Sequence, residues 1–294
     1  MEIITEPHRA AEWSAGCRRQ GATVGFVPTM GALHEGHLDL VTRALRECDQ
    51  VVCSVFVNPL QFNNAEDLAH YPRQVEQDTA LLVQAGCHAL FTPAKEAIFA
   101  EFTPAEYDLG GLDRYWEGPS RPGHFQGVVN VVERLFHYVR PDKAFFGEKD
   151  RQQLAILQYV ARTLRWPEHI VPCPTVRAAD GLALSSRNQR LSATERTTAT
   201  ALYKALCAMA EVAFTASPEQ TVAAGMAVLS AHPDVVLDYL AVADARTLAP
   251  LSQWSADGPA VALVAAQVGP VRLIDNMTLE RAGRGVEGRG GAAA

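Results

Sequence analysis

The chain has 294 residues, of which 48% are hydrophobic and 20% are charged, and its formal net charge is −7. This composition suits a soluble globular protein with one large or two modest domains, and the acidic balance argues against a broad nucleic-acid surface, which needs clustered Lys and Arg. We expect no signal peptide, because no basic region precedes an apolar run at the N-terminus. We also expect no membrane span, because no apolar stretch reaches the ~18 residues required.

Strand and helix signals alternate over residues 1–175. The β-prone run at 22–27 is expected to end at Pro28, and the continuous apolar run at 51–57 is typical of a strand buried on both faces. This alternation predicts an α/β fold with a parallel, doubly wound sheet, which binds ligands at the carboxyl ends of its strands. The predicted helices are 37–47, 75–85, 127–139 and 151–164, and the remaining strands are 89–91, 144–146 and 170–176.

From about residue 176 the pattern changes to α+β, which predicts a second, smaller domain. A capping box at 192–195 opens an Ala-rich helix that we expect to run to about Phe214. A helix at 218–230 and strands at 235–242, 260–268 and 271–274 complete this domain. The predicted domains are therefore 1–175 and 176–281, and the Gly-rich segment 282–294 is predicted to be a disordered tail.

The six cysteines are scattered, and none forms a C-x-x-C motif. This usage predicts free thiols in a reducing cytosol, where they serve as small buried hydrophobic residues. Structural disulfides are the alternative. We therefore expect a cytoplasmic protein.

His34 and His37 lie three positions apart, where a predicted strand gives way to a helix. Such residues share one helix face; Gly31 and Gly36 let the backbone approach a ligand, and nearby N–H groups favour an anion. The pattern suits two imidazoles that donate hydrogen bonds to a triphosphate during attack at its α-phosphorus. A surface pair or a partial metal site are the alternatives, but H-E-G-H lacks the H-E-x-x-H zinc spacing.

A second polar motif comprises Ser185, Ser186, Arg187 and Asn188. Alone it resembles an ordinary turn between domains. A polar loop on a second domain is also how a lid brings a cation onto phosphates, and the planar fork of Arg187 pairs bidentately with phosphate oxygens. Together with the histidine pair, this loop predicts the two halves of an adenylate-forming nucleotide site.

Two further segments place polar side chains after predicted strands. Lys149 is suited to neutralise a phosphate, and Asp150 to bind ribose hydroxyls or Mg²⁺; the alternative is a solvated turn with Asp150 as a helix N-cap. Gln153, one turn further on, is expected to face the same crevice. Gln61 is placed to hydrogen-bond a small polar substrate. Ordinary surface loops are the alternative for Gln61 and for the polar segments 71–73 and 121–125.

These motifs, in this order, resemble the pantoate–β-alanine ligase (pantothenate synthetase) family of the nucleotidyltransferase superfamily, which includes class I aminoacyl-tRNA synthetases. HEGH stands where the superfamily has its HIGH motif, and SSRN where it has its KMSKS loop. Two departures are Leu60 in place of an expected Thr and Asn63-Asn64 in place of a Gly-containing stretch. The segments that carry the resemblance are PTMGALHEGH, FVNPLQF, YPR, RPGHFQGVV, FGEKDRQQL, DGLALSSRN and RLIDN.

The resemblance implies a Rossmann-like domain followed by a smaller α+β domain, and ATP-dependent condensation of (R)-pantoate with β-alanine. It implies a cytoplasmic homodimer that uses Mg²⁺ carried by ATP. Gln61 and Gln153 would hold pantoate, and His37 is the residue usually assigned as proton donor. The residues expected to contact ATP are Met30, Gly31, Ala32, Leu33, His34, Glu35, Gly36, His37, Gly147, Glu148, Lys149, Asp150, Val176, Leu184, Ser185, Ser186 and Arg187.

The expected chemistry is adenylation of pantoate followed by attack of the β-alanine amine, with no covalent enzyme nucleophile. His34, His37, Lys149 and Arg187 would share the phosphate charge that develops. Acyl adenylates hydrolyse readily, so we expect a lid formed by 185–188 and 58–71. Three rivals remain open: a transferase that keeps the adenylyl group in its product, a tRNA synthetase, and an inactive nucleotide-binding regulator.

Overall fold

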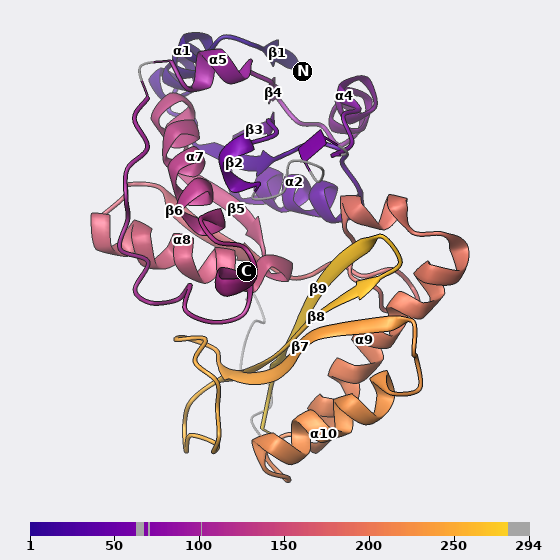
Figure 1. Cartoon of the computed structure of the whole chain (residues 1–294). Helices are drawn as coiled ribbons and strands as arrows, with labels where there is room; N and C mark the ends of the chain where they lie inside the picture. Colours follow the sequence, from indigo (N-terminus) through magenta and orange to yellow (C-terminus); the bar gives the residue numbers. More distant parts are fainter. Residues whose placement is uncertain (63–67, 70, 101, 282–294) are drawn as a thin grey trace, which may run out of the picture. The chain divides into compact units, whose positions relative to one another are not determined.

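The computed structural model describes residues 1–62, 68–69, 71–100 and 102–281 (Figure 1). The chain forms two compact units. The first comprises Met1–Ala178 with Ala183–Gln189, and the second comprises Ala179–Leu182 with the chain from Arg190 onward. The functional domain boundary near residue 176 stays a prediction, and the predicted tail 282–294 lies outside the described residues.

The first unit is built on a six-stranded sheet in which every neighbouring pair of strands is parallel, in the order β1-β4-β3-β2-β5-β6. The central strand β3 is buried over almost its whole length, as expected for a parallel sheet with both faces covered. The strands are β1 (Glu2–Ile4), β2 (Val24–Thr29), β3 (Gln50–Val55), β4 (Ala89–Phe91), β5 (Lys143–Gly147) and β6 (His169–Cys173).

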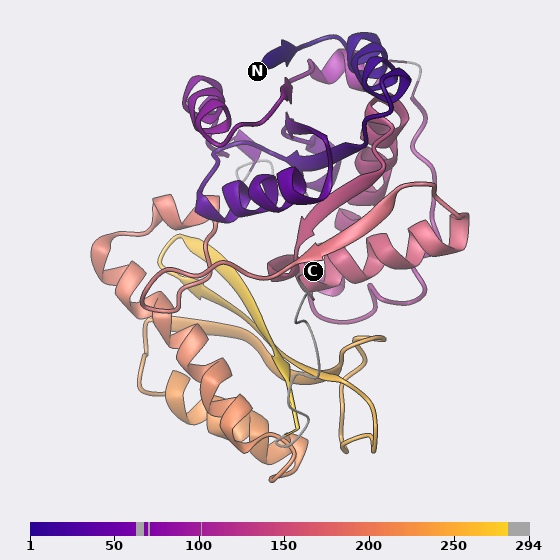
Figure 2. The same ribbon diagram turned by 180° about the vertical axis from the view of Figure 1, so that it is seen from behind.

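Helices cover both faces of this sheet, with α7 and α8 in front in Figure 1 and α2 in front in Figure 2. Successive side chains of β2 point to opposite faces. Val27 joins Val41 of α2 and Leu82 of α4 in one hydrophobic cluster, whereas the Phe26 ring lies 6.1 Å from the Phe136 ring of α7. The helices are α1 (Pro7–Arg19), α2 (Glu35–Glu47), α4 (Val75–Gln84), α5 (Lys95–Ile98), α6 (Glu117–Ser120), α7 (His124–Val139) and α8 (Arg151–Leu164).

The order of the strands reverses between β2 and β5. From β2 the chain proceeds outward to β3 and β4, and it then returns to β5 and β6 on the other side. In doubly wound sheets a ligand crevice opens at such a reversal, outside the carboxyl ends of the strands. The segments that follow β2 and β5 begin at Met30 and Glu148, so the topology brings two of the predicted motifs to this one point.

The second unit is a three-stranded antiparallel sheet in the order β7-β8-β9, against which α9 and α10 pack. Ala262 and Val264 of β8 share a hydrophobic core with Leu202 and Leu206 of α9. The capping box predicted at the start of α9 is present, with Ser192 and Glu195 side chains each bonded to the other's backbone N–H. The elements are α9 (Ala193–Val212), α10 (Pro218–Leu229), β7 (Val235–Asp244), β8 (Ala260–Val268) and β9 (Val271–Leu279).

The predicted fold class, a doubly wound parallel sheet followed by a smaller α+β domain, is confirmed. The prediction that Pro28 ends its strand is wrong, because Pro28 pairs with Ser54 inside β2. It is tolerated there because β2 is paired with β5 only at Gly25 and Phe26, so that edge of β2 is open beside Pro28. All six cysteines are free, as predicted.

Candidate active site

His34 and His37 form a capping box at the start of α2, in which imidazoles take the places usually filled by Ser and Glu. Nδ1 of His34 accepts a hydrogen bond from the Gly36 N–H at 3.2 Å, and Nδ1 of His37 accepts from the His34 N–H at 3.4 Å. The two rings lie with centroids 4.0 Å apart. Gly36 permits this arrangement, because a Cβ there would lie 3.0 Å from the His34 ring.

Both imidazoles are neutral at physiological pH. Burial, followed by the positive charge of Lys149, lowers the pKa of His34 to about 4. Burial, followed by His34 and Lys149, lowers the pKa of His37 to about 3. A ring nitrogen that accepts a hydrogen bond carries no proton, so each ring carries its proton on Nε2. The pair therefore offers two neutral Nε2–H donors.

The segment from Gly147 to Asp150 lies at the end of β5, and Glu148–Asp150 forms a 3₁₀ helix. Lys149 is close enough to both histidines to lower their pKa values. Asp150 is the N-cap residue of α8, although its side chain makes no capping hydrogen bond, and its negative charge acts on His34 and His124. The carboxyl ends of β2 and β5 thus place a cation and an exposed carboxylate beside the histidine pair.

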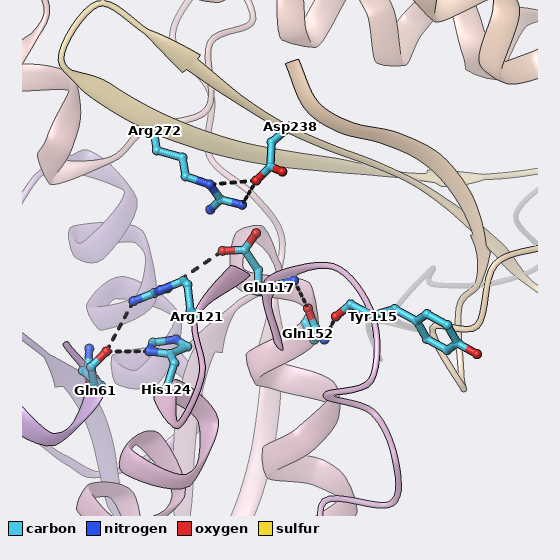
Figure 3. A network of polar contacts seen from close by, with 8 residues as sticks. All are labelled: Gln61, Tyr115, Glu117, Arg121, His124, Gln152, Asp238 and Arg272. Carbon is cyan, nitrogen blue, oxygen red and sulfur yellow. Dashed lines mark hydrogen bonds and ion pairs between the residues drawn. The ribbon is translucent and has the colours of Figure 1, made fainter. Parts of the chain in front are cut away.

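Gln61 ends the 3₁₀ helix Pro59–Gln61 in the segment after β3, where its backbone oxygen faces His124 and Arg121 (Figure 3). Its side-chain oxygen accepts from Asn58 Nδ2 at 3.2 Å, and its Nε2 lies 2.8 Å from the Met30 sulfur in the loop after β2. Its backbone oxygen faces His124 Nδ1 at 2.8 Å and Arg121 Nη2 at 3.5 Å. Because a carbonyl only accepts, His124 carries its proton on Nδ1. Burial, followed by Arg121, lowers the pKa of His124 to about 4.

The buried side-chain amide of Gln152 in α8 holds the backbone of the segment that precedes Arg121 (Figure 3). Gln152 of α8 donates to the backbone oxygens of Leu112 and Tyr115 at 2.7 and 2.8 Å, and it accepts from the Glu117 N–H at 3.0 Å. The Glu117 carboxylate lies 3.9 Å from the Arg121 guanidinium. Gln153, the predicted substrate ligand, is the half-buried neighbour of Gln152.

The Ser185–Asn188 segment contacts the loop after β2. The Ser186 hydroxyl donates to the Ala32 carbonyl oxygen at 3.0 Å, and the Arg187 guanidinium lies over the Tyr71 ring at 5.8 Å. The Ser185 hydroxyl accepts from the Arg187 N–H. Leu184 N–H bonds to the Val176 oxygen at 3.0 Å, which fixes the start of the segment. The structure therefore joins two motifs that the sequence separates by about 150 residues.

The remaining predicted site residues differ in how far they are exposed. Glu35 is exposed at the start of α2, and Gly147, Glu148 and Gln153 are half-buried. Residues 63–67 and 70 of the predicted 58–71 lid segment lie outside the described residues, which include Asn58 and Tyr71 but not Asn63-Asn64. Sequence reasoning missed Asp78, Glu117 and Gln152, whose hydrogen bonds join segments 35 or more residues apart in the chain.

The backbone N–H groups expected to bind an anion already have acceptors. The Asp78 carboxylate of α4 accepts from the Ala32 and Leu33 N–H groups at 2.9 and 2.7 Å. The Gly31 N–H donates to Thr29 Oγ1 at 3.2 Å. Among the described residues no group of three or more His, Cys, Asp or Glu side chains is arranged to hold a metal ion. No described helix is long and apolar enough to cross a bilayer.

The profile of the pantoate–β-alanine ligase family matches residues 2–278 of the chain. The chain belongs to this family. It is 49% identical to pantothenate synthetase of Rubrobacter xylanophilus over 286 residues, which cover 94% of the chain and 98% of that relative. It is 51% identical to pantothenate synthetase of Thermus thermophilus over 269 residues, covering 91% and 96% of the two chains. The enzyme class inferred from the motifs, a ligase of pantoate and β-alanine, is confirmed.

Solved structures of the same family share the fold. The crystal structure of pantothenate synthetase from Thermus thermophilus matches with a TM-score of 0.87 at 48% identity, covering 94% of this chain and 99% of that chain. A pantoate–β-alanine ligase from Francisella tularensis, in complex with βγ-ATP and β-alanine, matches with a TM-score of 0.75 at 31% identity, covering 95% and 97%. These neighbours extend over both units of the chain.

Proposed function

We propose that this chain makes pantothenate from (R)-pantoate, β-alanine and ATP in two half-reactions, with pantoyl adenylate between them. One observation carries the proposal: two neutral imidazoles, with their Nδ1 atoms occupied by backbone N–H groups, present two Nε2–H donors at the reversal of the sheet. Family membership supports the substrates, and the Francisella tularensis ligase is known with βγ-ATP and β-alanine bound.

In the first half-reaction a pantoate carboxylate oxygen attacks the α-phosphorus of ATP, and pyrophosphate leaves. Negative charge grows on the phosphate oxygens, and preorganised donors stabilise it more strongly than water does. His34 and His37 donate from Nε2, and Lys149 and Arg187 supply positive charge. Because His37 is neutral with a pKa of about 3, we assign it as a hydrogen-bond donor that keeps its proton.

In the second half-reaction the β-alanine amine attacks the acyl carbon, AMP leaves, and the nitrogen loses its extra proton as the amide forms. Adenylation is needed because a bare carboxylate would have to expel oxide. Gln61 and Gln153 are assigned to pantoate. The Gln61 amide is fixed between Asn58 and Met30, so it joins the pantoate position to the loop that carries the histidines.

Mg²⁺ would enter with ATP. Mg²⁺ keeps several waters and commonly takes one or two carboxylates besides substrate phosphates, and the exposed Asp150 carboxylate fits that requirement. The ion would supply neutralisation of phosphate charge. The residues assigned to the nucleotide are those of the loop after β2, of Gly147–Asp150, Val176 and Leu184–Arg187. We further propose that 185–188 forms a lid, and that the enzyme works as a cytoplasmic homodimer.

The test is to measure AMP and pyrophosphate released by the purified protein with MgATP and (R)-pantoate, with and without β-alanine. Sustained release of both products that requires both substrates is the expected result. Pyrophosphate without AMP would identify a transferase that keeps the adenylyl group, and AMP release that requires tRNA would identify a synthetase. Absence of turnover under all conditions would leave a nucleotide-binding protein without this activity.

A further inference from the structure

The loop between β2 and α2 includes one residue, Ala32, in a backbone conformation that its residue type does not favour. Gly31 has φ +86° and Ala32 has φ +51°. The left-handed region suits glycine, but for an alanine it is a strained conformation that persists only where the surroundings enforce it. The residue two positions after Ala32 is His34, the N-cap of α2. The conformation of this loop therefore sets where both imidazoles lie.

Asp78 holds the loop from the α4 side. Its side chain is buried with the residue 1% exposed, and its two oxygens accept from the N–H groups of Ala32 and Leu33 at 2.9 and 2.7 Å. The approach is close, since a Cβ on Gly31 would lie 2.9 Å from Asp78 Oδ2. Burial raises the pKa of Asp78, while these two N–H groups oppose that rise. The carboxylate thus occupies the place that a phosphate would take at these amides.

Ser186 holds the same residue from the opposite end. Its hydroxyl donates to the Ala32 carbonyl oxygen at 3.0 Å, and Ser186 is 6% exposed. Ala32 is fully buried. Its N–H is held by Asp78 and its C=O by Ser186. The hydroxyl proton of Ser186 is committed to the protein, in contrast to Ser185, whose oxygen accepts from the Arg187 N–H.

We propose that Asp78 and Ser186 are positioning residues that hold Ala32 between them, fix the strained loop, and so place the His34 and His37 donors. The proposal rests on the assignment of the two histidines to the nucleotide. It gives Ser186 a task in addition to the nucleotide contact assigned above, and it couples the Ser185–Asn188 segment mechanically to the histidine loop. Neither residue needs to touch a substrate for its loss to slow adenylation.

The test compares Asp78→Asn and Ser186→Ala with the wild type, and with Glu76→Gln as a matched control on the exposed side of the same first turn of α4. Asp78→Asn keeps the shape of the side chain but replaces one acceptor oxygen with an NH₂ group, which would face a backbone N–H. We expect pantoate-dependent pyrophosphate exchange to fall at least about 10-fold at saturating substrates, because misplacing catalytic groups by about 1 Å costs up to about 100-fold. The pantoate KM should change little, and Glu76→Gln should match the wild type.

A readout that needs no turnover separates this proposal from the proposed function. The imidazole ¹⁵N signals of His34 and His37, assigned with His34→Gln and His37→Gln, should show the Nε2–H tautomer in the wild type and shift in both positioning variants. Shifted signals in an enzyme without exchange activity would keep the positioning role and reject the assigned chemistry. The proposal would be overturned if Ser186→Ala and Asp78→Asn both kept the wild-type imidazole ¹⁵N signals and the wild-type rate of pyrophosphate exchange per folded molecule. If Asp78→Asn does not fold, Ser186→Ala decides alone.

Discussion

At the scale of single residues, each imidazole of the histidine pair does two tasks, one with each ring nitrogen. Each Nδ1 satisfies a backbone N–H at the start of α2, where a helix leaves its first N–H groups without partners. The same bonds fix the tautomer, so each Nε2 keeps its hydrogen for a ligand. Positive charge at the site must then come from other groups, of which Lys149 is the one that already acts on both rings.

Loss of a donor or of the cation should slow adenylation strongly. We expect His37→Ala and Lys149→Ala each to lose at least about 100-fold in pantoate-dependent pyrophosphate exchange, the scale of removing one preorganised charge-stabilising donor. His37→Gln, which retains an N–H near the Nε2 position, should retain more activity than His37→Ala. Near wild-type exchange in either alanine variant would reject that residue's role.

Gln61 should matter for pantoate more than for ATP. We expect Gln61→Ala to raise the pantoate KM by about 10-fold or more, the scale of about 1.5 kcal/mol for a lost buried hydrogen-bonding partner. The ATP KM should rise less, although Gln61 touches Met30. Steady-state kinetics with each substrate varied in turn measures both, and equal rises in the two constants would count against the assignment.

At the scale of elements, the position of Gln61 depends on how closely α7 approaches the 3₁₀ helix Pro59–Gln61. Gly127 of α7 lies against it, and a Cβ there would be 2.1 Å from the Leu60 carbonyl oxygen. The Gly127 oxygen in turn accepts from Asn58 Nδ2 at 3.0 Å. Only a residue without a side chain allows this approach, so the turn that holds Gln61 is built against the backbone of α7.

Gly127→Ala should therefore push the turn away from α7. We expect a loss of about 1–3 kcal/mol in the free energy of unfolding, the usual cost of overpacking, together with a raised pantoate KM. Gly16→Ala in α1 is the control, because the nearest heavy atom to its Cβ would be 3.8 Å away. Denaturant titration and pantoate kinetics on both variants test this, and equal behaviour of the two would show that the contact is not limiting.

The helical spacing of apolar residues predicted α8, which agrees with 151–164, and the short apolar run after Gly86 predicted β4, which agrees with 89–91. β1 and α1 were not, because β1 has a single buried residue and α1 buries only Pro7, Ala10 and Ser14. The motif loops could be found because their polar residues follow strands. Asp78 could not, since an acid in the first turn of a helix is ordinary and its partners lie 45 and 46 residues away.

The neighbours Gln152 and Gln153 show the same limit. They are successive residues of α8 and point about 100° apart around the helix. The local sequence does not indicate which of the two side chains forms hydrogen bonds within the protein. The contacts of Gln152 with the backbone of Leu112, Tyr115 and Glu117 answer this only after the chain between Leu112 and Glu117 has folded onto α8.

At the scale of the whole molecule, the site makes the fold sensitive to acid. His34, His37 and His124 have folded-state pKa values of about 4, 3 and 4, below the ordinary 6.5. At pH values between the folded-state pKa and 6.5, the unfolded chain binds protons that the folded chain does not. The free energy of unfolding therefore falls as pH falls below about 6.5. Each histidine contributes about 1.4 kcal/mol per pH unit in that window.

This contribution is measurable by denaturant unfolding at pH 7, 6 and 5. The His124→Asn variant keeps a donor toward the Gln61 carbonyl but cannot titrate. Its free energy of unfolding should therefore fall less steeply with acidification than that of the wild type, by about 1.4 kcal/mol per pH unit. Parallel curves for the two proteins would show that His124 is not held neutral by the fold.

The adenylate route is tested most directly by following the carboxylate oxygens of pantoate into the products. (R)-Pantoate labelled with ¹⁸O in both carboxylate oxygens is turned over with unlabelled MgATP and β-alanine. The masses of AMP and pantothenate are then measured by mass spectrometry. If the carboxylate attacks the α-phosphorus, one ¹⁸O of each labelled carboxylate must leave in AMP and the other must remain in the pantothenate amide. AMP without the label, or label released in phosphate or water, would contradict a pantoyl adenylate at this site.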